Sequence, residues 1–470
     1  MMVARNWVDD GFYGRYLVGQ PAPPGLEGHY PVVASVALIF RFFGIGLWQA
    51  RLPGVIYTFG AFALAFYLAF QLFGLRAGFG TLVVLLLFIA RPEINPIMIG
   101  RQVLGDIPAV FFLLAGYTGF VLADRVSGYC LLLVMFFWGL ALASKIQTLP
   151  FWLLAIVAPA GLLTWRRQWK LLGILLIAAF GSWLVYLGIG HIKALVLNGH
   201  TLSPVTLDNL FRITALVTVP SIRLESLRTA LSFCLVPFVG LIFFVPIFLR
   251  MVLRKGKIDP DEILKFSLWL LAGSWFSWYI LLSNGGLRYL AIPAFLSSFF
   301  AGAMLETWSR NFSIRESLHE SALMVNHRQL SKTGVGAFGA LILTVVCIPI
   351  TLGTYLNYWM GKDDSAKRLA QEMNTTTAKN VLIESYDSEF LFYLDRLYHY
   401  PPDQIHVALL SRYLLGTQEA IDYSPLAANP DYIVVGEVSR DWGLYDPILD
   451  NGEFRLLKEE GRYQIYERSR

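Results

Sequence analysis

The chain has 470 residues, of which 56% are hydrophobic, 15% aromatic and only 15% charged. Soluble domains carry roughly 25% charged residues, so this composition argues against a soluble enzyme and indicates a protein embedded in lipid. The net charge of +5 is modest and no basic stripe with interleaved aromatic residues occurs, so no nucleic-acid partner is expected. The cysteines Cys130, Cys234 and Cys347 all lie in apolar runs, which predicts neither a disulfide framework nor a metal site.

An acidic pair, Asp9-Asp10, lies at the start of the chain between aromatic residues of the kind that favour a membrane interface: Trp7, Phe12, Tyr13 and Tyr16. Adjacent acids on a short tail are usually only solvated charge. At a lipid–water boundary, however, a carboxylate can accept a proton from an attacking hydroxyl or bind a divalent cation. We therefore expect residues 1–52 to form a first extracytoplasmic loop that carries this pair.

Residues 30–50 are apolar, but Arg41 interrupts them, Gly44 and Gly46 follow, and Pro53 closes the segment. This pattern predicts an amphipathic helix that lies in the interface without spanning the membrane. The alternative is an eleventh span, which would place the acidic pair on the cytoplasmic side.

Windows free of charge predict about ten transmembrane helices within residues 53–355, because a span needs about 20 mainly apolar residues. The long windows lie between Arg51 and Arg76, Arg125 and Lys145, Lys145 and Arg166, Lys170 and Lys193, Arg228 and Arg250, Lys265 and Arg288, and Lys332 and Lys362. The short windows lie between Arg76 and Arg91, Asp106 and Asp124, and Arg288 and Glu306. These can still span if their ends snorkel or the bilayer thins.

Lysine and arginine in the short loops predict the orientation in a plasma (inner) membrane. The loops on one side are richer in basic residues, for example around residues 166–170 and 250–257, and that side is expected to face the cytoplasm. The acidic pair, the loop that precedes Asp106, the loop at residues 191–228 and the C-terminal tail then face outward.

Beyond residue 355 the sequence becomes polar and predicts a small extracytoplasmic α/β domain at residues 356–470. A helix is expected near residues 365–373. Strands are expected at Val381–Ile383, residues 405–410 and Tyr432–Val435, followed by a hairpin of residues 454–457 and 463–466. No glycine-rich phosphate loop follows a strand, so no nucleotide cofactor is expected. The expected fold class is an α-helical polytopic membrane protein with a small C-terminal soluble α/β domain.

Asp106 lies at the mouth of an expected span, within Gly105-Asp106-Ile107-Pro108. An ionisable residue that enters hydrocarbon is costly, which makes Asp106 a functional candidate. The same residue also suits the N-terminus of a helix, with Pro108 in the first turn. Both roles can hold at once.

Four further residues are candidates for substrate or phosphate binding. Lys145 and Arg288 lie at the outward ends of spans, where they could clamp a phosphate or else snorkel to lipid headgroups. Arg101 could likewise either bind a phosphate or snorkel to lipid headgroups. His29 could donate a hydrogen bond or bind a metal, although a lone loop histidine more often does neither.

The order of these motifs resembles the GT-C superfamily of membrane glycosyltransferases. The closest pattern is the bacterial family 39-type group, which contains the protein O-mannosyltransferases and the aminoarabinose transferase of lipid A. The resemblance is carried by the acidic pair, Gly28-His29-Tyr30-Pro31, Ala50-Arg51-Leu52-Pro53, Arg101 with Gly105-Asp106-Ile107-Pro108, and the tail motifs Tyr398-His399-Tyr400-Pro401-Pro402 and Pro430-Asp431-Tyr432.

The resemblance implies a polyprenyl-phosphate-linked sugar as donor and an active site outside the membrane, and leaves the acceptor unknown. Asp9 corresponds to the acid of the first outer loop, as general base or metal ligand, with Asp10 as its neighbour. Asp106 matches the acid of the second outer loop. Lys145 and Arg288 match basic positions that stabilise the departing lipid phosphate. A divalent metal ion, Mg²⁺ or Mn²⁺, at Asp9 and Asp106 is also expected, and attack opposite the phosphate would invert the anomeric centre.

The family carries a transmembrane helix before the acidic pair, whereas only a few residues precede Asp9 here, so we expect a start assigned too late or a truncated chain. Two other functions fit a multispan chain. A transporter or flippase of a lipid-linked or small solute would explain the spans, but transporter sites tend to lie mid-membrane on repeated halves. A non-catalytic receptor would use the tail as its working part.

Overall fold

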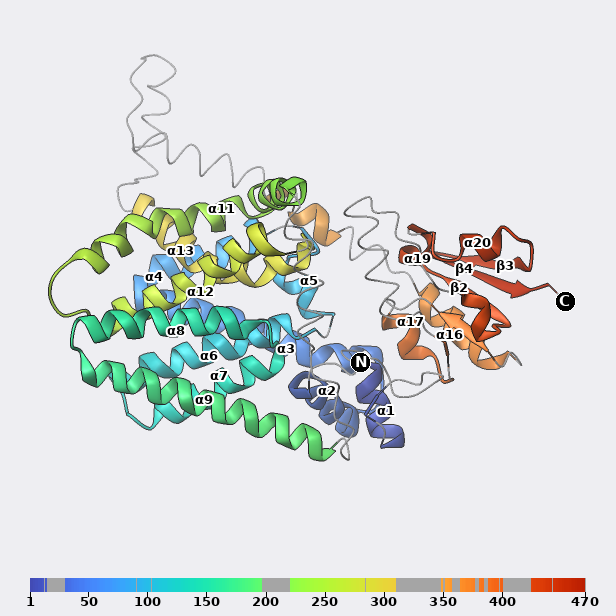
Figure 1. Cartoon of the computed structure of the whole chain (residues 1–470), viewed down its shortest axis with the longest axis horizontal. Helices are drawn as coiled ribbons and strands as arrows, with labels where there is room; N and C mark the ends of the chain where they lie inside the picture. Colours follow the sequence, from blue (N-terminus) through green and yellow to red (C-terminus); the bar gives the residue numbers. More distant parts are fainter. Residues whose placement is uncertain are drawn as a thin grey trace, which may run out of the picture.

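Long apolar helices form a bundle that makes up most of the molecule, and a small sheet domain lies beyond one end of it (Figure 1). The computed structural model describes residues 1–11, 13–14, 30–89, 91–102, 104–196, 220–283, 285–309, 348–349, 351–356, 364–376, 380–383, 388–396, 398–399, 424–441 and 443–469.

The bundle confirms the expected transmembrane windows up to Glu306. Its elements are α3 (Leu47–Phe73), α4 (Leu75–Val83), which continues as η1 (Val84–Phe88), α6 (Asp106–Arg125), α7 (Cys130–Ser144), α8 (Thr148–Trp165), α9 (Trp169–Val196), α11 (Pro220–Leu253), α12 (Pro260–Leu282) and α13 (Ala291–Ser309). Within the described ranges, 6 helices are long and apolar enough to cross a membrane, and shorter apolar helices accompany them. The chain is therefore a multi-pass membrane protein. The window between Lys332 and Lys362 lies mostly outside the described residues.

Glycines let the helices of the bundle approach closely, as is usual for helices packed in lipid. A Cβ atom added at Gly302 in α13 would lie 2.5 Å from the backbone nitrogen of Thr81 in α4. One added at Gly240 in α11 would lie 2.5 Å from the backbone nitrogen of Ala301. Backbones therefore meet at these crossings with no room for a side chain.

Residues 30–50 form two helices. α2 (Tyr30–Phe43) ends where Gly44 adopts φ 80, a left-handed conformation that suits glycine. The expectation that Pro53 closes this helix is wrong, because Pro53 lies inside α3 (Leu47–Phe73), which continues through it. The expected boundary between residues 52 and 53 thus falls inside a helix. At 1.5 Å per residue, α2 is about 21 Å long, short of the ~30 Å hydrocarbon core.

The C-terminal domain confirms the expected helix near residue 365, the first and third expected strands, and the hairpin. Its elements are α16 (Ser365–Thr375), β1 (Val381–Ile383), α17 (Ser388–Tyr393), η4 (Pro425–Ala428), β2 (Tyr432–Val435), α19 (Glu437–Asp441), α20 (Asp446–Leu449), β3 (Phe454–Glu460) and β4 (Tyr463–Arg468). The sheet order is β1-β2-β4-β3, with β1 parallel to β2 and the other pairs antiparallel. The strand expected at residues 405–410 lies outside the described residues.

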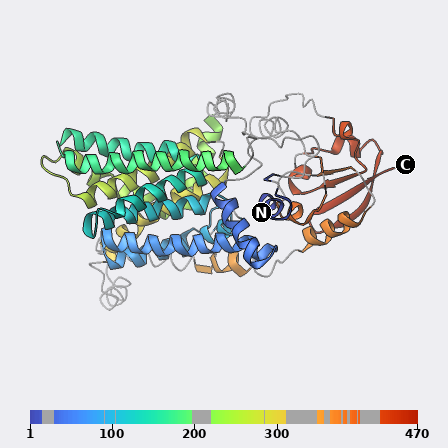
Figure 2. The ribbon, with the colours of Figure 1, turned by 90° about the horizontal axis from the view of Figure 1, so that it is seen from below.

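The N-terminal helices belong to the core of this domain. α1 (Met2–Asp10) and α2 lie between the bundle and the sheet, as two perpendicular views show (Figures 1 and 2). Val3, Ala4 and Phe40 from these helices are buried in one hydrophobic cluster with Phe392 and Ile465. The segments 1–52 and 356–470, which we expected to be separate domains, therefore share one core.

Adding a side chain at Gly302, where two helix backbones meet, should destabilise the bundle. Gly302→Ala is expected to cost about 1–3 kcal/mol of unfolding free energy, because the added methyl group forces α4 and α13 apart. The matched control is Gly161→Ala in α8, where no atom lies within 4 Å of the added Cβ and alanine favours the helix. Thermal unfolding in detergent measures both variants. Equal midpoints for the two would contradict this packing.

Candidate active site

Asp106 is the first residue of α6. It closely follows the short helix α5 (Pro96–Gly100), which Figure 1 shows at the end of the bundle that faces the C-terminal domain. Its carboxylate is fully buried. The Lys145 ammonium donates to Oδ1. The Arg288 guanidinium donates to Oδ2 from Nε at 2.9 Å and from Nη2 at 2.7 Å. The structure therefore brings together three of the residues expected at the site, and we call them the Asp106 cluster.

Three helix ends build the Asp106 cluster. Lys145 directly follows α7 and closes its last turn by donating its N–H to the Ala141 carbonyl. Arg288 lies in the short helix η3 (Leu287–Leu290), which follows a glycine turn with Gly285 at φ 79. Asp106 begins α6, where a negative charge is favoured by the helix dipole. The cluster thus fixes the relative positions of α6, α7 and the start of α13.

Apolar and aromatic side chains complete the surroundings of the Asp106 cluster. Ile99, Ile107 and Ala291 form a buried group beside Tyr57. The Lys145 ammonium lies 5.8 Å from the centre of the Tyr289 ring. Low-polarity surroundings strengthen the attraction between these charges and any anion that enters.

The Asp106 cluster carries two positive charges and one negative charge, a net charge of +1. The Arg288 side chain remains 44% exposed, whereas that of Lys145 is only 7% exposed. A guanidinium that keeps one face open beside a buried cation is suited to a phosphate oxygen. The arrangement can therefore bind an anion through Arg288, with Lys145 adding a second positive charge behind it.

A divalent metal does not fit the Asp106 cluster. Both carboxylate oxygens of Asp106 already accept hydrogen bonds from cations, and the surplus positive charge would repel a metal ion. In the part of the chain that the structure describes, no group of three or more His, Cys, Asp or Glu side chains could hold a metal. The expected metal at Asp9 and Asp106 stays a prediction that these contacts do not favour.

The acidic pair lies at the last turn of α1, with both carboxylates exposed. Asp9 lines a hollow of about 720 Å³ between α1 and α2, and Arg41 and Ile45 lie on its other wall. Among the described residues, no hydrogen bond or ion pair joins the pair to Asp106. The structure therefore holds the first-loop acids and the Asp106 cluster as separate groups.

The other expected site residues are placed as follows. Arg101 is partly buried and follows the short helix α5 (Pro96–Gly100), five residues before Asp106. A Cβ added at Gly54 of α3 would lie 1.9 Å from the Gly100 carbonyl oxygen, so α5 is pressed against α3. His29 lies outside the described residues.

Asn95, which precedes Asp106 by eleven residues, has a structural role that was not predicted from the sequence. Its side-chain oxygen accepts from the backbone N–H groups of Ile97 at 3.0 Å and Met98 at 3.3 Å, which caps α5. Its amide nitrogen donates to the Ile89 carbonyl and to the Tyr355 hydroxyl. The Asn-Pro step at residues 95–96 is a usual start of a helix and could have revealed this cap.

Comparison with solved structures relates the whole chain to ArnT from Cupriavidus metallidurans. The crystal structure bound to undecaprenyl phosphate matches with a TM-score of 0.56 at 13% sequence identity, and covers 99% of this chain and 92% of that chain. The apo crystal structure matches with a TM-score of 0.58 at 14% identity, and covers 99% and 91%. No protein-family model and no curated protein matches the sequence. The chain therefore shares the fold of ArnT, and the expected fold class, a polytopic helical membrane protein with a small C-terminal α/β part, is confirmed.

Proposed function

We propose that the chain is an integral membrane glycosyltransferase that moves a sugar from a polyprenyl-phosphate donor to an acceptor hydroxyl outside the plasma (inner) membrane. The acceptor would be a glycan, lipid or protein of the cell envelope. The observation that carries this proposal is the net positive Asp106 cluster at the end of a GT-C bundle. The shared fold supports it, because one of the matching ArnT structures holds undecaprenyl phosphate.

The Asp106 cluster would receive the donor phosphate. Departure of the lipid phosphate leaves an anion, and a preorganised cation pair stabilises that charge as it develops. Arg288 would contact phosphate oxygens with its exposed N–H groups, and Lys145 would add charge from behind. Asp106 would hold both cations in place, and so it would act on the phosphate only through them.

The first-loop acids would serve the acceptor. Asp9 is proposed as the general base that takes the proton of the attacking hydroxyl, with Asp10 as its neighbour. One base and one charge-stabilising group suffice for attack opposite the phosphate, which inverts the anomeric centre. In such a transfer the base and the leaving group act on opposite faces of the sugar, so Asp9 need not contact the Asp106 cluster.

The transporter alternative is less well supported. Asp106, Lys145 and Arg288 gather at one end of the bundle, whereas transporter sites usually lie near the bilayer midplane on interrupted helices. Residues of the C-terminal domain also share a core with α1, the helix that carries the acidic pair. A transporter has no need for such a domain beside these acids.

Asp9→Asn should abolish the proposed transfer. Loss of a general base lowers the rate by roughly 10²–10⁴-fold, so cells with Asp9→Asn should show the same cell-envelope glycans as a deletion strain. Asp10→Asn is the matched variant and should keep part of the activity. Mass spectrometry of envelope glycans and lipids makes the comparison. An unchanged profile in the deletion strain would refute the transferase function.

Arg288→Lys should weaken binding of undecaprenyl phosphate by roughly tenfold, about 1.4 kcal/mol, because lysine cannot reproduce the planar fork of arginine. Arg288→Ala should weaken it further. Arg76→Ala is the control, since Arg76 is an exposed arginine of α4. Equilibrium binding to the detergent-solubilised protein measures all three. If Arg288→Ala bound undecaprenyl phosphate as tightly as the parent chain, Arg288 would not be part of the phosphate site.

Asp106→Asn should destabilise the bundle by about 3–5 kcal/mol, because Lys145 and Arg288 would keep their charges without a buried partner. Asp261→Asn is the matched control: Asp261 pairs with Arg125 at 2.7 Å, but both side chains are more than a third exposed, and such pairs contribute about 0–1 kcal/mol. Chemical unfolding in detergent compares them. Similar losses in the two variants would show that the Asp106 cluster does not hold the helices together.

A further inference from the structure

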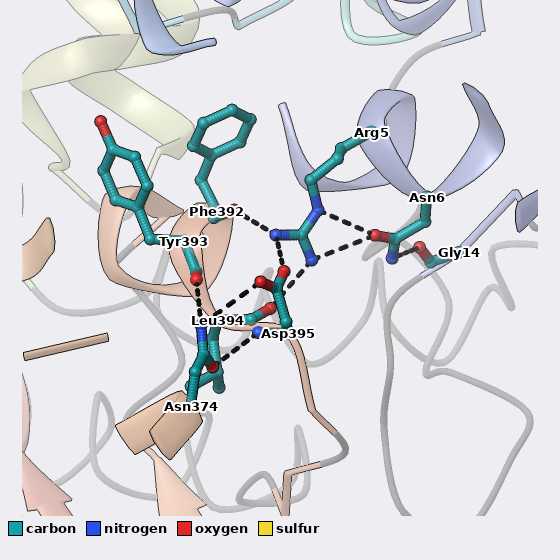
Figure 3. A network of polar contacts seen from close by, with 8 residues as sticks. All are labelled: Arg5, Asn6, Gly14, Asn374, Phe392, Tyr393, Leu394 and Asp395. Carbon is teal, nitrogen blue, oxygen red and sulfur yellow. Dashed lines mark hydrogen bonds and ion pairs between the residues drawn. The ribbon is translucent and has the colours of Figure 1, made fainter. Parts of the chain in front are cut away.

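Arg5 is a buried arginine on α1 that joins this helix to the C-terminal domain (Figure 3). It is only 7% exposed. Its guanidinium donates to the carbonyl oxygens of Phe392 and Leu394, and to Oδ1 of Asp395 at 2.8 Å. A single side chain near the start of the chain thus makes three contacts with a loop about 390 residues later.

These acceptors lie at the C-terminal end of α17. Carbonyl groups at such an end lack partners within the helix and carry partial negative charge, so a cation is favoured there. Asn374 of α16 braces the same loop, since its amide donates to the Tyr393 carbonyl at 2.9 Å and its side-chain oxygen accepts from the Asp395 N–H at 2.9 Å. The surface that receives Arg5 is therefore rigidly built.

Asn6 links Arg5 to the segment that contains the acidic pair. Its side-chain oxygen accepts from Nε and Nη2 of Arg5 at 3.3 and 3.4 Å, and its amide donates to the Gly14 carbonyl at 2.8 Å. Gly11, in the left-handed conformation, donates its N–H to the Asn6 carbonyl. Asp9 and Asp10 thus lie between Asn6 and Gly14, two residues that a hydrogen bond joins directly.

This polar network adds to the apolar packing of Val3 and Ala4, which also holds α1 against the C-terminal domain. A helix of 9 residues is marginal in isolation. Two carboxylates in its last turn oppose the helix dipole, and no basic residue accompanies them there. The exposed position of both acids is thus maintained against local preference by contacts at the other end of the helix.

We propose that Arg5 is a positioning residue for the transfer reaction. By docking α1 on the C-terminal end of α17, it makes the C-terminal domain set the place of Asp9 and Asp10. This inference rests on the proposed function, in which Asp9 is the base. It gives the C-terminal domain a direct part in catalysis through the orientation of α1.

The test compares Arg5→Ala, Arg5→Lys and Asp395→Asn with Arg51→Ala. Arg51 is the control because it also ties the bundle to α17, through Glu389 at 3.4 Å, but it lies on α3, and no hydrogen bond or ion pair among the described residues joins it to α1. Asp395→Asn changes an exposed carboxylate and leaves both carbonyl acceptors, so it tests the contact if Arg5→Ala folds poorly. Full-length protein in membrane vesicles is used throughout.

Three readouts separate positioning from docking. The first is the initial rate of formation of the glycan that the deletion strain lacks. The second is binding of undecaprenyl phosphate. The third is amide hydrogen exchange in α1. Arg5→Ala should lower the rate by roughly 10–100-fold, as expected for a misplaced catalytic group, with phosphate affinity within twofold of the parent and faster exchange in α1. Arg5→Lys should recover part of the rate, Asp395→Asn should lose less, and Arg51→Ala should stay within twofold.

Faster exchange in α1 of Arg5→Ala with an unchanged rate would overturn the proposal, because docking would then be structural only. Equal losses in Arg5→Ala and Arg51→Ala would overturn it too, by assigning the effect to attachment of the domain as a whole. If the parent chain forms no glycan that the deletion lacks, the proposed function fails and the positioning role fails with it. The exchange experiment would in that case still report whether Arg5 docks α1.

Discussion

The burial of the Asp106 carboxylate is the constraint on which the arrangement of the bundle depends. A carboxylate removed from water must be paired, and one with two oxygens can hold two cations at once. The two cations come from different helix ends, Lys145 after α7 and Arg288 before α13. Helices in lipid gain little from burying apolar faces against each other, since lipid tails are as apolar as the side chains, so close packing and polar contacts must fix their positions. The Asp106 cluster supplies such polar contacts at the end of the bundle where chemistry is proposed.

The same cluster accounts for the kind of ligand that this end can bind. Two cations paired with one anion leave one positive charge in excess, which favours binding of an anion. Because the Lys145 ammonium is buried, water screens this charge only weakly. A metal ion would need the carboxylate that the cations already occupy. The geometry thus favours a phosphate at Arg288, with the acid that handles the acceptor placed elsewhere. Asp9, exposed beside a hollow between α1 and α2, satisfies that requirement.

Composition and periodicity were sufficient to predict most elements, because each depends on residues close together in the chain. The windows without charge became helices, and the strands Val381–Ile383 and Tyr432–Val435 formed with the expected bounds. The helix end expected near Pro53 was wrong because α3 continues through this proline, so a proline alone does not mark where a helix ends. The Asp106 cluster could be predicted only as three separate candidates, since its members lie 39 and 182 residues apart. Contacts at such separations have no signature in one sequence.

Arg5 illustrates a stronger limit of sequence reasoning. Its partners are mainly backbone carbonyls at the end of α17. Every residue has a backbone carbonyl, so the sequence does not indicate which ones Arg5 will contact. An arginine near the N-terminus therefore reads as solvated charge until the fold is known. The shared core has a consequence for folding as well. During synthesis α1 precedes residues 365–469 by more than 350 residues, so α1 is made well before its docking surface. Asp9 and Asp10 then reach their places only after the C-terminal domain has folded against α1, so the position of the proposed base depends on a segment made much later than α1 itself.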